Sequence, residues 1–260
     1  VADENTVVLT PAKPDITLIA GFSDYPAAIV HQSFNGDPLD NPIGTGPYLP
    51  EEFEVGNRAV LVKNTDHQWW GEGAYLDRIE YLDFGTDQAS IVAAVDADEV
   101  DMIYESIGEF IPILDDIGWN KSEAVTANTV VIRANQEAEI DGKKPYADAR
   151  VRRALAMAID NSVLLELGFA GNGRVAENHH VSPIHPEYAE LPAPVFDPAA
   201  AKALMEEAGM GDFEHELISI DDTWRKDTTD AAAAMLRDAG INVKRTILPG
   251  STFWNDWLKY

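Results

Sequence analysis

The hydrophobic and polar positions in the last part of the chain follow the two periods that distinguish strands from helices. Residues 214–220 and 241–248 have the pattern of short strands, whereas residues 226–239 carry apolar side chains at helical spacing. Gly240 is placed to stop the helix. A strand, a helix and a second strand in this order predict a β–α–β unit, so we expect an α/β fold in the second half.

Three more helices are predicted upstream of this unit. Residues 148–160 place Val151, Leu155 and Ala158 on one side and arginines on the other. Asp160 can cap a short helix that follows it. Asp197 can cap a helix over 199–208 that Pro198 opens and Gly209 ends, in agreement with the rules for both helix ends.

The first half predicts mostly strands. The segment NPIGTGPY (41–48) combines two glycines and two prolines and predicts turns. Residues 58–64 alternate as a strand does, and we expect them to pair antiparallel with a strand over 78–84. We also expect strands over 6–10, 100–104 and 124–134.

A helix is predicted over residues 87–95, with Thr86 as its N-cap. The carboxylates of Asp96, Asp98, Glu99 and Asp101 follow it closely. They lack the central glycine and distal glutamate of a calcium loop, so a solvated turn is the preferred interpretation. The Gly44–Gly46 pair is not a nucleotide loop, because Pro47 follows directly and the third glycine is missing.

Composition narrows the possible partners. The chain has 260 residues, 45 acidic against 19 basic, and a formal net charge of −26. Such a field repels nucleic acids and anionic lipid surfaces. A solvated acidic surface is the simplest interpretation, and attraction of cationic ligands is the alternative. No run of 18 apolar residues predicts a membrane span, and the absence of cysteine excludes disulfides and thiolate metal sites.

Two regions are candidates for ligand binding. The connection over 171–196 is long and rich in proline, and loops of that length are often functional. The second region follows the strand expected at 100–104, because ligands of α/β proteins bind near strand ends. The candidate ligand-binding residues in these regions and near the end of the chain are Tyr104, Glu105, Ser106, Asn178, His179, His180 and Trp254. Packing roles for Trp254 and the histidines remain open alternatives.

An ordered set of segments carries a family resemblance. RAVLVKN (58–64), YLDRIEYLDF (75–84), DADEVDMIY (96–104) and PYADARVRRALAMAIDNSVL (145–164) follow NPIGTGPY in fixed order. This order resembles the extracellular solute-binding proteins of bacterial ABC importers, family 5, the peptide and oligopeptide class. The resemblance adds Asn135, at the end of a crossing strand, to the candidate ligand-binding residues.

The resemblance implies a two-lobe, periplasmic-binding-protein-like α/β fold of type II that is incomplete in this chain. Residues 1–40 would end the small subdomain of lobe I, residues 41–131 would supply its main sheet, and residues 132–260 would begin lobe II. Family chains are about twice this long, so we expect an internal fragment whose export signal is not included.

The function implied by the resemblance is non-covalent capture of a short peptide or similar solute between two lobes, with delivery to membrane permease subunits. The expected protein is periplasmic and monomeric, is not an enzyme, and needs no cofactor or metal. Two alternatives remain at this point. One is a carboxylate-dependent hydrolase that uses Glu105 and Asp101, and the other is a sensory ligand-binding module.

Overall fold

The computed structural model describes residues 3–23, 27–37, 39–66, 68–126 and 128–256. The chain divides into two units, Val1–Asp83 and Phe84–Tyr260. The division expected at residue 131 concerns the lobes of a longer protein and stays a prediction.

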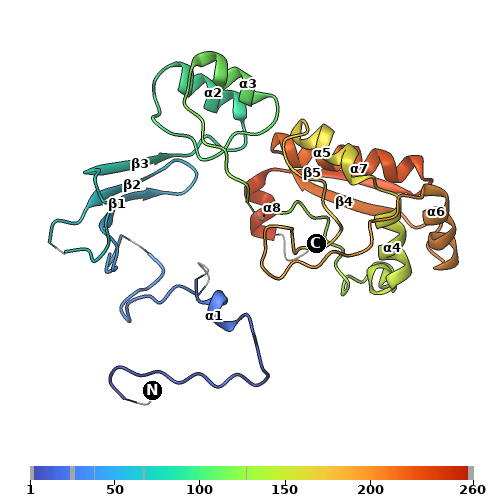
Figure 1. Ribbon diagram of the computed structural model, residues 1–260, viewed down its shortest axis with the longest axis horizontal. Helices are drawn as coiled ribbons and strands as arrows, with labels where there is room; N and C mark the ends of the chain where they lie inside the picture. The colour runs from blue at the N-terminus through green and yellow to red at the C-terminus, as the bar shows by residue number, and fades with distance from the viewer. Residues whose placement is uncertain (1–2, 24–26, 38, 67, 127, 257–260) are drawn as a thin grey trace. The chain divides into compact units, whose positions relative to one another are not determined.

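The first unit is built on a three-stranded antiparallel sheet of β1 (Tyr48–Glu54), β2 (Arg58–Lys63) and β3 (Arg78–Leu82), in that order (Figure 1). The antiparallel pair of β2 and β3 is confirmed. The sequence did not reveal β1, because Pro50 and three glutamates disturb its alternation. A register shift between Pro50 and Glu52 accommodates the proline, which has no N–H to donate.

Ion pairs connect the three strands across one face of this sheet. Arg58 pairs with Glu52 on β1 at 2.5 Å and with Glu80 on β3 at 3.7 Å. Arg78 reaches Glu51 at 2.8 Å. All of these side chains are partly exposed, so solvent screens each pair and its contribution to stability is small. The pairs therefore favour the strand register more than they stabilise the unit.

The second unit contains one parallel strand pair and most of the helices. Strands β4 (His215–Ile220) and β5 (Val243–Leu248) pair in parallel, and α7 (Thr223–Asp238) connects them and packs on both (Figure 1). The predicted β–α–β unit is therefore confirmed, with α7 beginning three residues earlier than expected. The other helices of the chain are α1 (Leu18–Gly21), α2 (Gln88–Asp96), α3 (Phe110–Ile117), α4 (Ala149–Met157), α5 (Asn161–Phe169), α6 (Pro198–Glu207) and α8 (Gly250–Asp256), with a short 3-10 turn at Pro145–Ala147.

Aspartate caps explain where most of these helices begin. The side chains of Asp160 and Asp197 accept hydrogen bonds from Ser162 N at 2.9 Å and Ala200 N at 2.9 Å, as their sequence positions predicted. The predicted cap of α2 was one residue off. Asp87, and not Thr86, accepts from Ala89 N at 3.0 Å.

The predictions of three strands are wrong. Residues 6–10 form only an isolated bridge between Asp3 and Thr6, and residues 100–104 and the described residues of 124–134 are irregular. All three segments are apolar enough to suit a strand, but a strand also needs a neighbour for its backbone hydrogen bonds. By contrast, the connection over 171–196 contains no helix or strand, as expected.

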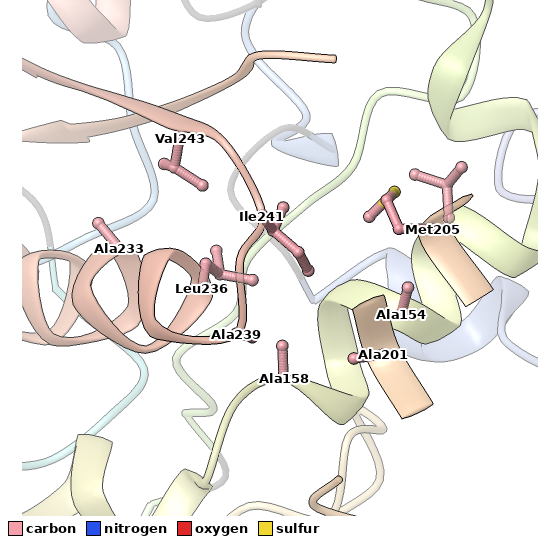
Figure 2. Close-up of a cluster of buried hydrophobic side chains, with 10 residues drawn as sticks. Ala154, Ala158, Ala201, Met205, Ala233, Leu236, Ala239, Ile241 and Val243 are labelled. Atoms are coloured by element: carbon pink, nitrogen blue, oxygen red, sulfur yellow. The ribbon is translucent and has the colours of Figure 1, made fainter. Parts of the chain in front are cut away.

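The core of the second unit lies where α4, α6, α7 and β5 meet (Figure 2). Met205 of α6 is 1% exposed and packs among alanines, with Ala154 of α4 and Ala201 of α6 completely buried. Small side chains allow the helices to approach closely, and the larger side chains fill the remaining space. The full cluster is Val151, Ala154, Ala158, Ala201, Met205, Ala233, Leu236, Ala239, Ile241 and Val243.

Replacing Met205 with alanine should lower the free energy of unfolding by about 2–5 kcal/mol, because the small neighbours cannot close the cavity. Urea denaturation followed by circular dichroism measures the change. Met102→Ala, at a position 79% exposed, is the matched control and should change stability by less than about 0.5 kcal/mol. Equal effects of the two substitutions would contradict the packing described here.

A buried histidine lies at the start of β4. His215 is 4% exposed, its Nδ1 is 3.2 Å from the Tyr146 hydroxyl, and its ring meets Phe213 edge-on at 4.9 Å. Among the described residues, its Nε2 has no hydrogen-bond partner. Burial therefore disfavours the imidazolium and lowers the pKa of His215 to about 4.

This histidine should make stability fall in acid. The folded-state pKa lies below the ordinary value, so the unfolded chain binds the proton more readily. The stabilising effect is complete above about pH 6.5 and is lost as the pH falls towards 4, with a total of at most about 3 kcal/mol. His215→Phe should flatten the stability profile between pH 6.5 and 4 in urea titrations. Parallel profiles for the two proteins would contradict this prediction.

Candidate functional site

An open hollow of about 200 Å³ lies within the second unit, beside the first turn of α7. It is bounded by the C-terminal end of α5, the start of α7 and residues 105–109 before α3. Side chains of very different character line it, among them Glu105, Glu109, Leu167, Thr223, Trp224 and Asp227. The hollow lies just beyond the carboxyl end of β4, which is where α/β proteins commonly bind ligands.

The first turn of α7 is held by a buried aspartate. Asp222 caps the helix by accepting from Arg225 N at 3.1 Å, and its carboxylate also forms an ion pair with the Arg225 guanidinium. Burial raises the pKa of Asp222, and the charge and hydrogen bonds of Arg225 partly oppose that rise. The aspartate therefore fixes both the start of α7 and the position of the arginine.

Trp224 is the aromatic wall of the hollow. The Arg225 guanidinium lies 3.9 Å from the centroid of its ring, and the Phe169 ring of α5 lies 5.1 Å away at an angle of 52°. Both contacts restrict the indole, through cation–π attraction and aromatic packing. The indole is thus oriented before any ligand arrives.

Close packing of α5 on α7 gives the hollow its floor. The Thr228 hydroxyl donates to the Trp224 carbonyl at 2.7 Å, one turn back along α7. A Cβ atom at Gly168 would come within 1.8 Å of that hydroxyl oxygen. Only glycine allows this approach, so Gly168 brings the end of α5 next to the start of α7.

The candidates Tyr104, Glu105 and Ser106 lie close to this hollow in the chain, although the expected strand before them does not form. Glu105 lines the hollow, whereas Tyr104 is 94% exposed. The Ser106 hydroxyl is buried and has no hydrogen-bond partner among the described residues. Of the predicted candidates, Glu105 is thus the one found at the hollow.

The loop candidates lie elsewhere in the same unit. Asn178 accepts from Asn161 Nδ2 at 2.8 Å, and His179 Nε2 lies 3.0 Å from the Glu177 carboxylate. Tyr188 donates to the same carboxylate, so Glu177 organises the loop from within. His180 is exposed. A second hollow of about 290 Å³ includes Glu177 in its lining, but none of these three candidates.

Asn135 and Trp254 line neither hollow. Asn135 accepts from Glu137 N at 3.1 Å within a turn. Trp254 is on α8, is 58% exposed and meets Phe253 edge-on at 5.1 Å. Their roles as ligand contacts stay predictions.

Trp224 was missed because the helix predicted from the sequence began at Lys226. Asp227 lay inside that predicted helix but was not recognised as a candidate. The signal was present in the sequence DDTW (221–224). An aspartate at the end of a strand can cap the next helix, and an aromatic residue two positions later then falls in its first turn.

The described residues contain no group of three or more histidine, aspartate and glutamate side chains that could hold a metal ion. The acidic cluster at residues 96–101 lies on an exposed turn after α2. This agrees with the solvated turn that the sequence favoured over a calcium loop. No described helix is long and apolar enough to cross a membrane.

Comparison with known proteins adds a family match over the whole chain. The model of bacterial extracellular solute-binding proteins, family 5 middle, matches residues 1–260. The heme-binding protein A of Haemophilus influenzae is 28% identical over 217 residues, which cover 80% of this chain and 38% of that protein. The dipeptide-binding protein of Escherichia coli is 26% identical over 219 residues, covering 80% and 39%.

A solved structure agrees on the fold. The PBP AgaA of A. tumefaciens R10, in complex with agropinic acid, superposes with a TM-score of 0.73 at 20% identity, covering 95% of this chain and 50% of that one. The structural neighbours have the two-lobe fold of periplasmic peptide-binding proteins, which confirms the expected fold class. The chain spans about two fifths of the length of the two curated relatives above.

Gly168→Ala should destabilise the second unit by about 1–3 kcal/mol, because the added methyl group meets the Thr228 hydroxyl. Thermal unfolding measures the loss. In the double variant Gly168→Ala with Thr228→Ala, part of the loss should be recovered, since the closest clash is removed. Gly250→Ala is the matched control, because its Cβ would make only an ordinary contact of 3.5 Å. Strict additivity of the two substitutions would contradict the close approach.

Proposed function

The chain belongs to the bacterial extracellular solute-binding proteins of family 5, and on this premise we propose that it is part of the solute-binding component of an ABC importer. The intact protein captures a short peptide or a similarly small solute and delivers it to permease subunits in the membrane. We further propose that it acts in the periplasm as a monomer. The family consists of transport proteins rather than enzymes, and this removes the support for the hydrolase alternative.

The observation that carries this proposal is the hollow between residues 105–109 and the helices α5 and α7. We propose that residues 1–131 belong to lobe I, with 1–40 in its small subdomain, and that residues 132–260 begin lobe II. Under this division Glu105 belongs to lobe I and Trp224 to lobe II. The hollow then lies between the lobes, where a solute-binding protein encloses its ligand.

The proposed mechanism is a shift between open and closed states. A ligand that contacts both sides of the hollow binds the closed state more tightly, and this difference in affinity draws the equilibrium towards closure. Trp224 is held by Asp222, Arg225 and Phe169 through the contacts described above. Little of the binding energy is then lost in ordering that side of the hollow.

Ligand binding should raise the melting temperature of the intact protein. A ligand present at 100 times its Kd stabilises the folded state by about 2.7 kcal/mol. A thermal-shift screen against peptides, oligosaccharides and metal chelates would detect this. The absence of stabilisation by every class would count against the proposed function.

Trp224→Ala should weaken binding of a ligand found in that screen by about tenfold or more, since it removes a preordered aromatic contact worth on the order of 1–2 kcal/mol. Isothermal titration calorimetry measures the affinity, and Trp224→Phe should retain most of it. Trp70→Ala, an exposed tryptophan of the first unit, is the matched control and should bind as the wild type does. Unchanged affinity in Trp224→Ala, with the fold intact, would remove the hollow from the proposed binding site.

A further inference from the structure

Resting on the proposed function, we propose that the hollow beside Trp224 selects solutes with a cationic side chain, one that ends in an ammonium or a guanidinium. The inference concerns the chemical class of the ligand. It depends on the charges around the hollow and on the half-buried Trp224 indole in its wall.

Three carboxylates line the hollow. Glu105 and Glu109 come from the segment before α3, and Asp227 comes from the second turn of α7. Among the lining residues of the described chain there is no lysine or arginine. Lys226 neutralises part of the charge by pairing with Asp227 at 3.3 Å. Neither Glu105 nor Glu109 forms an ion pair with any described residue, so two carboxylates remain available to a ligand.

The partial positive charges at the N-terminal ends of three helices oppose these carboxylate charges, but they are weaker. Gln88, Glu109 and Thr223 each lie at the N-terminal end of a helix, where the backbone carries a partial positive charge of about half an elementary charge. Asp87 and Asp222 cap two of the three ends and offset that charge. The full charges of the carboxylates therefore dominate, and the hollow favours a cation over an anion.

The Trp224 indole adds a specific contact to the nonspecific attraction of cations by the carboxylates. Carboxylates on a surface would only gather counter-ions, but here the Trp224 side chain lines the same hollow of about 200 Å³. The Arg225 guanidinium already lies over this ring, 3.9 Å from its centroid, so a cationic ligand would contact the part of the indole that lines the hollow. Ile107 and Leu167 add apolar surface that would cover the hydrocarbon stem of a cationic side chain.

The charge of the whole chain acts in the same direction. A net charge of −26 attracts cationic solutes over longer distances and raises their rate of encounter, an effect that salt screens. Attraction of cationic ligands was the alternative explanation of the acidic composition. The hollow beside Trp224 is the place where we propose that such ligands bind. Association of a cationic ligand should weaken as ionic strength rises.

The experiment uses the intact protein and three dipeptides that share one scaffold and differ in one side chain: lysine, norleucine or glutamate. Calorimetry should show the lysine peptide binding about tenfold or more tightly than the norleucine peptide, with the glutamate peptide the weakest. Glu105→Gln should reduce affinity for the lysine peptide about five- to tenfold and leave the norleucine peptide unchanged. Trp224→Leu keeps an apolar wall and should also reduce the preference for lysine.

Glu206→Gln is the control, because it removes one negative charge from an exposed position on α6 that does not line the hollow. It should bind all three peptides as the wild type does. Equal affinities for the three peptides, or equal losses for all of them in Glu105→Gln, would overturn the inference while leaving the proposed function intact.

Binding of neutral or anionic solutes alone, from any class, would overturn the inference in the same way. Failure of the protein to bind any peptide, oligosaccharide or chelate would instead count against the proposed function itself. These outcomes are distinguished by the same titrations.

Discussion

The burial of one face of α7 is the constraint on which the second unit depends. Ala231, Ala232 and Ala233 are buried on this helix, and Leu236 continues the same face one turn later. Their small side chains let the helix lie close to α5, β4 and β5, all of which it contacts. Because α7 is held in this way and Asp222 caps its start, the first turn has a fixed position, from which Trp224 and Asp227 reach the hollow.

Arg245 links the same three elements by polar contacts. Its side chain is 10% exposed, pairs with Asp230 of α7 at 2.8 Å and donates to Ser219 Oγ of β4 at 2.6 Å. The Asp230 side chain is 41% exposed, so solvent screens this ion pair and it adds little to stability. Its geometry is specific, however, because the planar guanidinium can meet all its acceptors only in one register of strands and helix.

The fold of this family does not by itself determine which ligand a member binds. Relatives of this chain are named for heme and for dipeptides, and a structural neighbour holds agropinic acid. One fold thus serves solutes of different charge and shape, so the fold alone does not choose a ligand. In the site proposed above, the choice depends on the few side chains that line the hollow. The carboxylates of Glu105 and Glu109, which form no ion pair with any described residue, line it together with the Trp224 indole.

The sequence by itself determined those features that depend on near neighbours in the chain. Asp160 and Asp197 predicted helix starts because a cap bonds to a backbone N–H only two or three residues away. The β–α–β unit followed from hydrophobic period, and the family from the order of its segments. Tertiary structure decided which apolar segments became strands. Residues 100–104 and the described residues of 124–134 form no strand, whereas β1 forms despite Pro50 because β2 lies beside it. Tertiary structure also determined which residues line the hollow. Glu105 and Trp224 are far apart in sequence, and only the packing of α5 on α7 through Gly168 gives the hollow the floor on which they meet.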